Sequence, residues 1–306
     1  MASLAALEKL LVMILIMMIG YACAKAHWID KRFSDMASKL LMNVFIVGTI
    51  LSSVANVKPA LESDELLIAV AAAFVEFILC GIVGFAVSRC IGLEGKSRNV
   101  AWLSIFFMNN VFVGFPVVEA MFGSEAVFSA ALTNLPFNLL LYTVGINQLQ
   151  EGARDWRERI RRTLTTPLFA TIIAALIFVF QIPVPSLLCD TFSILGGATV
   201  PVSMIVIGIS LSAVPVREAL LDWRAYVVSL ARLILCPVVV YFTLGLFLPV
   251  GITLNVDTVT AACPTAAIVT ILCVQLKADD RFAAKINFLT TTLCAISLPI
   301  VSYLIL

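Results

Sequence analysis

Ten segments of this sequence are each long and apolar enough to cross a lipid bilayer as a helix. Such a helix needs about 20 mostly apolar residues, and the segments cover residues 5–24, 36–55, 66–89, 99–122, 126–149, 166–182, 190–213, 224–248, 257–276 and 283–306. The chain is 61% hydrophobic and 13% charged, and a soluble fold of this size would bury only about three quarters of its surface. Strands of a membrane barrel are shorter and alternate in polarity. The sequence therefore predicts an all-α, multi-pass integral membrane protein.

The distribution of basic residues predicts how the segments are oriented. Cytoplasmic loops of membrane proteins carry an excess of Lys and Arg. Of the 20 Lys and Arg residues, 17 fall in the loops after the first, third, fifth, seventh and ninth segments. Lys9 and Lys58 fall on the other side, and Arg232 falls within the eighth segment. This asymmetry predicts that both termini lie outside the cytoplasm.

The residue types argue against several classes of function. The formal net charge of +1 argues against nucleic-acid binding, and a single histidine, His27, excludes a multi-histidine metal site. The eight cysteines form no C-x-x-C motif and lie mostly in apolar runs, so we interpret them as reduced core residues. The aspartates that an intramembrane aspartyl dyad would need fall at or near segment ends (Asp30, Asp35, Asp190 and Asp257). We therefore expect no enzyme, no metal site and no bound cofactor.

A polar stretch at 151–162 divides the ten segments into two sets of five. We interpret residues 1–150 as a first repeat and residues 151–306 as a second. Because each set holds an odd number of helices, the second repeat would cross the membrane in the opposite sense. Inverted repeats of this kind are typical of secondary transporters, whose halves exchange conformations to give alternating access.

Two sequence matches between the halves support the repeat. Residues 47–54 (VGTILSSV) resemble residues 207–214 (IGISLSAV), and residues 76–80 (EFILC) resemble residues 232–236 (RLILC). Either match alone is weak, because apolar segments often match by chance. The two matches occur in the same order and at nearly the same offset, which favours a true internal repeat.

The fourth and ninth segments are interrupted at corresponding places in the two repeats. A proline within a helix removes a backbone donor and clashes with the preceding turn, and unwound backbone at membrane depth is tolerated where it is buried in protein or lines a cavity. Ordinary proline kinks are the alternative, since other segments contain proline at positions 136, 201, 237 and 299. The cluster Asn-Asn-x-x-x-Gly-x-Pro in the fourth segment favours a substrate site. The candidate binding residues there are Asn109, Asn110, Gly114, Pro116, Cys263, Pro264 and Thr265.

Polar residues in other segments extend this candidate site. Asn134 and Asn138 lie four residues apart in the fifth segment and share one helix face. They either line the cavity or hydrogen-bond to a neighbouring helix. Asn43 and Ser203 occupy matching positions in the second and seventh segments, and we expect them to complete the site from its opposite wall.

Glu76 and Arg232 are ionisable residues well inside the third and eighth segments, at equivalent positions of the repeat. A charged residue at the bilayer centre costs at least about 2.5 kcal/mol on insertion scales, so it usually faces a partner or water. We predict that these two side chains pair. Two interpretations stay open: a static ion pair, or a proton carrier in which Glu76 leaves Arg232 as substrate moves.

The motifs in the interrupted segments resemble those of the auxin efflux carrier family. The fourth helix of that family carries roughly Gly-Asn-x-Gly-Asn-x-Gly-x-Pro, of which this chain keeps Asn109, Gly114 and Pro116. Residues 108, 111 and 112 depart from the pattern, with Met, Val and Phe where Gly, Gly and Asn are typical. Residues 263–265, Cys-Pro-Thr, are similar to the Met-Pro-Thr of the family's ninth helix.

The resemblance implies a fold and a function. The fold is a ten-helix inverted repeat, with a scaffold of helices 1, 2, 6 and 7, a transport domain of helices 3–5 and 8–10, and crossed broken helices 4 and 9. The function is transport of small organic anions, mostly carboxylates, as by the family's bacterial malate or malonate permeases. A bacterial inner membrane and a homodimer through the scaffold helices are further expectations. Met108 and Phe112 predict an acid less polar than malate.

The sequence leaves the coupling ion open. Proton symport, or uniport driven by the membrane potential, is favoured over sodium coupling because Glu76 is the only acid predicted at mid-membrane. Carbonyl and amide oxygens can nevertheless hold sodium without a carboxylate. A sodium-coupled organic-anion symporter of the same architecture and a non-transporting membrane sensor therefore remain the alternatives.

Overall fold

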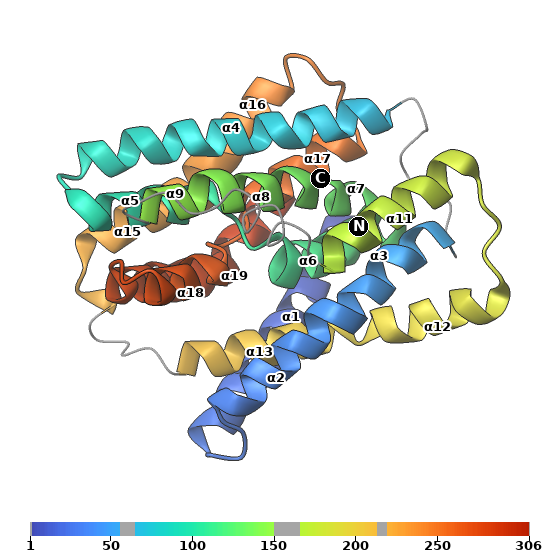
Figure 1. Ribbon diagram of the computed structural model, residues 1–306, viewed down its shortest axis with the longest axis horizontal. Coiled ribbons are helices and arrows are strands. Elements are labelled where there is room, and N and C mark those ends of the chain that lie inside the picture. Colours follow the sequence, from blue (N-terminus) through green and yellow to red (C-terminus); the bar gives the residue numbers. More distant parts are fainter. Residues whose placement is uncertain (1, 56–64, 150–165, 213–218, 306) are drawn as a thin grey trace.

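The computed structural model describes residues 2–55, 65–149, 166–212 and 219–305, and these residues are helical almost throughout (Figure 1). In the first half of the chain the elements are α1 (Ala2–Lys25), α2 (Lys31–Leu40), η1 (Leu41–Phe45), α3 (Ile46–Ala55), α4 (Leu66–Cys90), α5 (Gly95–Phe106), η2 (Asn110–Gly114), α6 (Phe115–Phe122), η3 (Ser124–Ala126), α7 (Val127–Leu132), α8 (Asn134–Leu140), η4 (Leu141–Gly145) and α9 (Ile146–Leu149). In the second half they are α11 (Thr166–Phe180), α12 (Ser186–Gly197), α13 (Thr199–Ser212), α15 (Trp223–Leu230), η5 (Ala231–Leu235), α16 (Cys236–Leu244), α17 (Ile252–Ala261), α18 (Ala267–Gln275) and α19 (Asp280–Ile305).

The helices confirm the predicted all-α class. The described part of the chain contains no strand, apart from one isolated bridge between two residues. Among the described residues, six helical runs are long and apolar enough to cross a bilayer: Arg32–Ala55, Leu66–Cys90, Ser124–Leu149, Ser186–Ile209, Trp223–Leu244 and Asp280–Val301. Shorter apolar helices cover Leu11–Lys25, Asn110–Phe122 and Thr166–Phe180. The polar stretch at 151–162, where the sequence predicts the boundary between repeats, lies outside the described residues.

The helix α4 shows why this chain suits a bilayer. It exposes large apolar side chains, Ile78 and Ile82 among them, and buries Glu76 completely. A helix of a soluble protein has the opposite arrangement, with its charged face in water. The cost of leaving an ionisable group in lipid explains the inversion, because such a group is retained only where it faces the protein interior.

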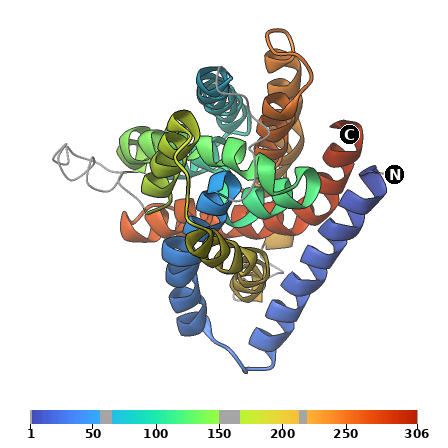
Figure 2. The same cartoon turned by 90° about the vertical axis from the view of Figure 1, so that its right-hand side faces the viewer.

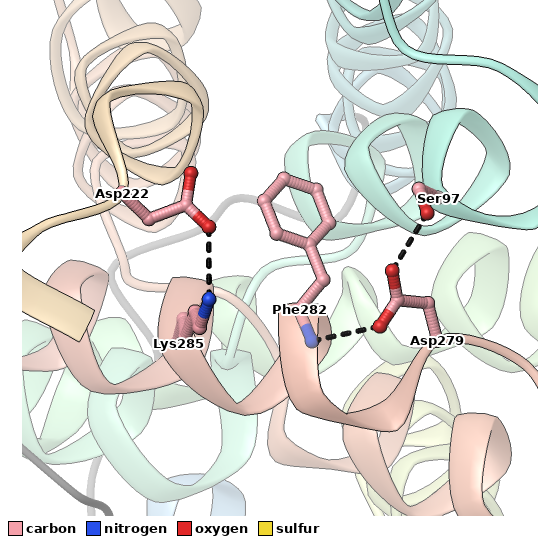
Figure 3. Close-up of polar contacts among 5 residues, drawn as sticks. All are labelled: Ser97, Asp222, Asp279, Phe282 and Lys285. Atoms are coloured by element: carbon pink, nitrogen blue, oxygen red, sulfur yellow. Dashed lines mark hydrogen bonds and ion pairs between the residues drawn. The ribbon is translucent and has the colours of Figure 1, made fainter. Parts of the chain in front are cut away.

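The termini of the described chain lie on the same side of the molecule. The beginning of α1 and the end of α19 are close together in both views (Figures 1 and 2), and the two helices contact each other. On another face, Lys285 of α19 forms an ion pair of 3.0 Å with Asp222, just before α15, and Ser97 of α5 donates to the Asp279 carboxylate over 2.6 Å (Figure 3). These contacts join three regions that the sequence places on one side of the membrane.

Glycines allow very close helix contacts in one part of the fold. The helix α1 packs along α13, and α3 packs along α12 and α11. A side chain at Gly20 would meet the backbone of Ile205 at 2.5–3.0 Å, and one at Gly48 would meet the nitrogen of Gly196 at 2.9 Å. Small residues let helix backbones approach in membranes, where helix association depends on van der Waals packing rather than on the hydrophobic effect.

Replacing Gly208 by alanine should therefore lower the stability of the protein. The new Cβ would overlap the backbone of α1, where the nitrogen of Tyr21 would lie 2.7 Å away. Overpacking of this kind costs about 1–3 kcal/mol. The matched control is Gly197→Ala, because a Cβ at Gly197 meets nothing within 4 Å. We expect tryptophan-fluorescence melting in detergent to show a lower Tm for Gly208→Ala alone; equal melting of the two variants would contradict the close contact.

Candidate functional site

The two interrupted segments meet and hydrogen-bond to each other. Met108 and Thr265 form an isolated antiparallel bridge. The backbone N–H of Asn109 donates to the carbonyl of Pro264 over 2.8 Å, and that of Ala266 donates to the carbonyl of Phe107 over 2.9 Å. Unpaired backbone groups are not tolerated in the hydrocarbon region of a bilayer. Each non-helical stretch therefore supplies partners that the other requires.

Local sequence explains where the first segment breaks. The helix α5 ends at Phe106, and Pro116 occupies the first turn of α6, where a missing N–H leaves no donor unsatisfied. Between them, the side-chain oxygen of Asn109 accepts a hydrogen bond of 3.2 Å from the N–H of Phe112 and caps the π-helical turn η2. The predicted interruption in this segment is therefore a capped helix start rather than a proline kink.

The second segment breaks between α17 and α18, over residues 262–266. Within this stretch, the Thr265 hydroxyl donates to the carbonyl of Ser104 over 2.7 Å, and the Thr265 N–H donates to the Thr290 hydroxyl over 3.3 Å. Cys263 and Thr265 are completely buried. Residues from two other parts of the chain, α5 and α19, thus hold the non-helical backbone in place.

Arg232 joins the ends of both broken helices. Its Nε donates to the carbonyl of Cys263 over 3.0 Å, its Nη1 to the carbonyl of Ile105 over 2.6 Å, and its Nη2 to the carbonyl of Ala261. These carbonyls lie at or just beyond the C-terminal ends of α5 and α17. Helix C-termini carry partial negative charge, so the fully buried guanidinium compensates two of them at once.

Arg232 itself lies in a π-helical turn, η5, which ends two residues before Pro237 in the first turn of α16. The turn η2 stands in the same relation to Pro116. Short π-helical turns are rare and are frequent at functional sites. Both turns carry residues of the crossing, which fits that tendency.

Glu76 and Arg232 each bond to other groups instead of forming the ion pair that the sequence predicts. Glu76 accepts a hydrogen bond of 2.9 Å from the Thr260 hydroxyl, and its second carboxylate oxygen is buried with no hydrogen-bond partner. Three of the five N–H donors of the guanidinium bond instead to carbonyl groups of the broken helices. No direct ion pair between Glu76 and Arg232 occurs in the described structure.

Asp257 is a second buried acid, contrary to its predicted place at the end of a segment. The helix α17 begins at Ile252, so Asp257 lies within it and is 2% exposed. Hydropathy alone missed the start of this helix, because Thr253 and Asn255 make its first turns polar. The expectation that Glu76 is the only acid at this depth in the fold is therefore wrong.

The predicted asparagines of the first repeat lie beside the crossing or near it. The Asn110 amide donates to the Thr133 hydroxyl over 2.8 Å, and the Asn138 amide donates to the carbonyl of Asn134 over 2.9 Å. The Asn110 side-chain oxygen and the Asn134 side-chain nitrogen are buried with no hydrogen-bond partner. Buried polar atoms in this state are available to a ligand, since leaving them unpaired costs about 1–3 kcal/mol each.

Asn43 and Ser203 are not brought to the crossing by any contact that the structure describes. Asn43 is exposed, accepts a hydrogen bond of 2.6 Å from the Thr166 hydroxyl of α11 and donates to the carbonyl of Lys39. Ser203 is buried and donates within its own helix to the carbonyl of Val200. Their positions match in the sequence, but their side chains bond elsewhere: Asn43 to Lys39 and Thr166, and Ser203 to Val200.

A small apolar cavity of about 50 Å³ lies next to the crossing. Its walls come from the two interrupted segments and from α1, α13 and α19. It is lined by Met13, Ile14, Met17, Val113, Val117, Met204, Ile207, Pro264, Thr291, Cys294, Ala295, Leu298 and Pro299. Sequence reasoning missed these α1 and α13 residues, because methionine and isoleucine in an apolar helix carry no signal that separates a cavity wall from a lipid-facing surface.

Replacing Arg232 by lysine should destabilise the protein although the charge is kept. A lysine ammonium cannot reproduce the planar fork that reaches three carbonyls, and each orphaned buried carbonyl costs about 1–3 kcal/mol. The control is Arg98→Lys, since Arg98 is only half-buried. Melting in detergent should show a clear loss for Arg232→Lys alone, and an unchanged Tm would mean that the fork is not required.

Comparison with known proteins is consistent with this architecture. A family model described as "membrane transport protein" matches residues 5–160 and 153–302. An uncharacterized transporter of Methanothermobacter thermautotrophicus is 24% identical over 294 residues, which cover 96% of each chain. An uncharacterized transporter of Methanocaldococcus jannaschii is 24% identical over 313 residues, which cover 98% of this chain and 99% of the relative.

Proposed function

We propose that this chain, which belongs to the membrane transport protein family, also called the auxin efflux carrier family, is a secondary carrier of small organic anions. The family match confirms the resemblance read from the sequence. Substrate, mechanism and coupling are the parts that we propose. The substrate would bind where the two broken segments cross, and alternating access would move it across the membrane.

The observation that carries this proposal is the crossing itself. Two non-helical stretches, 107–109 and 262–266, hydrogen-bond to each other among buried residues. In transporters built from inverted repeats, broken helices at corresponding positions form the substrate site near the bilayer midplane. We therefore assign the ten predicted segments to two inverted repeats of five, whose fourth helices supply the two breaks.

The electrostatics of the crossing favour an anionic substrate. Each broken segment has one half-helix ending at the crossing and one beginning there. The negative C-terminal ends of α5 and α17 are compensated by Arg232, while the N-terminal ends of η2–α6 and α18 keep their partial positive charge. Helix N-termini are ready-made sites for carboxylates. We place the substrate carboxylate there, with the amides of Asn110 and Asn134 close by.

The cavity beside the crossing favours an acid with an apolar body. Met13, Met17 and Met204 form much of its wall from the α1 and α13 side, and Val113 and Pro264 form part of the wall from the crossing. Methionine side chains adapt to irregular apolar shapes. A second carboxylate, as in malate, would lie against these side chains without partners, and burying an unpaired charge is strongly unfavourable. We therefore favour a monocarboxylate with an aromatic or aliphatic body.

The packing of the helices agrees with a division into scaffold and transport domain. The helices α1, α3, α11, α12 and α13 contact one another, with α1 along α13 and α3 along α12. The helices α4, α5, α15, α16, α17 and α19 form a second set of neighbours. We propose that the first set is the scaffold, and that the second set carries the crossing as it moves. A homodimer would form through the scaffold.

Sodium coupling at the crossing is the less favoured alternative. In sodium-coupled carriers, carbonyl groups of unwound helices coordinate the ion. Here the corresponding carbonyls of Ile105, Ala261 and Cys263 are bonded to Arg232. A guanidinium that belongs to the chain thus takes the position that a sodium ion would need.

Transport by the purified protein in proteoliposomes tests the proposal. We expect saturable uptake of labelled benzoate or indole-acetate, and weaker uptake of malate and malonate. Asn109→Ala should lower uptake several-fold, because loss of the cap at η2 costs about 1 kcal/mol at the crossing. Asn99→Ala is the matched control, since its amide bonds to the carbonyl of Gln148, away from the crossing. Absence of uptake of every acid by folded protein would favour the non-transporting sensor.

A further inference from the structure

Two buried carboxyl groups, one of them on the helix that leads into the crossing, have oxygen atoms without partners. Glu76 of α4 is 0% exposed and Asp257 of α17 is 2% exposed. The Oε2 atom of Glu76 and the Oδ2 atom of Asp257 are buried and accept no hydrogen bond. A buried carboxylate that is neither paired nor hydrogen-bonded is strongly unfavourable, and in practice such a group is neutralised. Something must neutralise this pair.

Thr260 bonds to the Glu76 carboxyl group and lies one turn after Asp257 in α17. Its hydroxyl lies 2.9 Å from Oε1 of Glu76, 3.0 Å from the carbonyl of Asp257 and 3.0 Å from the carbonyl of Val256. A hydroxyl has one hydrogen to donate and two lone pairs that accept, so one hydrogen faces three acceptor oxygens. A proton on Glu76 would supply a second hydrogen, because Glu76 could then donate to Thr260 while Thr260 donates to its own helix.

The charged and titratable groups around Glu76 come from four elements. Asp257 approaches from α17 and Arg232 from η5, while Cys80 lies one turn further along α4 and Cys236 begins α16. Cys263 at the break interacts with Glu76 as well. Arg232 is the only cation among them; it donates to three backbone carbonyls and also interacts with the Cys80 thiol. Two nearby carboxyl groups that share one site do not both ionise readily.

We propose that Glu76 and Asp257 together form a proton-binding site that couples movement of the organic anion to movement of a proton. This inference rests on the proposed carrier function and names its coupling ion. A proton from water on one side forms an O–H bond with one of the two carboxylates. It returns to water on the other side, and no other bond changes. One proton and one monocarboxylate per cycle give electroneutral transport.

The geometry offers a route from the proton to the substrate site. Thr260 lies in the last turn of α17, which ends at Ala261, and the non-helical stretch of the crossing follows directly. When Glu76 is protonated, it donates to the Thr260 hydroxyl instead of accepting from it. The Thr260 hydrogen is then free to bond to a carbonyl of α17 and so changes the hydrogen bonding of this last turn. The carbonyl of Ala261 is also bonded to Arg232. The same short stretch therefore contacts both the proton site and the helix ends at the crossing.

A metal ion fits the pair less well than a proton does. The described residues contain no group of three or more His, Cys, Asp or Glu side chains that could hold a metal ion. The pair offers two free oxygen atoms, whereas hard cations such as calcium take six to eight oxygen ligands. One proton satisfies a carboxyl pair with no further ligand.

Infrared difference spectroscopy tests the pair without any transport. The purified protein is cycled between a neutral and an alkaline buffer, and the C=O stretching band of a protonated carboxylic acid is followed. We expect this band at neutral pH in the wild type and its loss in both Glu76→Gln and Asp257→Asn. Glu125→Gln, at the half-exposed η3 turn, is the control and should keep the band. A wild type without the band, or a band that survives in both variants, would overturn the proposal.

Transport under imposed gradients tests the coupling. With one proton per anion, a pH difference of about one unit should raise the accumulation ratio about tenfold. Asp257→Asn and Glu76→Gln should lose this stimulation but retain exchange of labelled for unlabelled substrate across the membrane. Exchange in the wild type with no response to pH, or a response to sodium that either variant removes, would overturn the proton site and leave the carrier function standing. Absence of any exchange would contradict the carrier function instead. The infrared experiment would still test whether Glu76 and Asp257 hold a proton.

Discussion

The structure depends on one constraint: backbone polar groups at membrane depth must have partners within the protein. Residues 107–109 and 262–266 are not helical, so their N–H and C=O groups lose the partners that a helix provides. They recover partners from each other through the Asn109–Pro264 and Ala266–Phe107 hydrogen bonds. Arg232 supplies donors for carbonyl groups at the broken ends. These hydrogen bonds join the two halves of the chain at the crossing.

The position of Arg232 determines which helix ends at the crossing are compensated and which partners Glu76 has. Because its guanidinium bonds to the C-terminal ends of α5 and α17, the uncompensated helix ends at the crossing are the positive N-terminal ones. For the same reason it does not pair directly with Glu76, and that carboxyl group is left with Thr260 as its partner and Asp257 as its neighbour. The proposed anion site and the proposed carboxyl pair therefore both depend on one buried arginine.

The α1–α13 region is built on a different principle from the crossing. Close backbone contacts at glycine hold α1 to α13 and α3 to α12, and the hydroxyls of Thr49 and Thr199 lie 2.7 Å apart between α3 and α13. These contacts need few polar partners. Met13, Met17 and Met204 face the apolar cavity beside the crossing, so a polar, hydrogen-bonded unit and a closely packed apolar unit meet at that cavity.

Most of the fold could be read from the sequence, whereas much of the site could not. Runs of apolar residues with the length of a bilayer specify helices, since the hydrocarbon region requires every backbone group to be paired within the segment. Motifs around Asn109, Pro116 and Pro264 marked the breaks because proline and capping residues act locally. Partners between distant segments have no such local signature. Packing decided that Arg232 bonds to carbonyls of α5 and α17 and that Thr260 bonds to Glu76, because only the tertiary structure brings these atoms within hydrogen-bonding distance. It also placed Asp257 inside a helix.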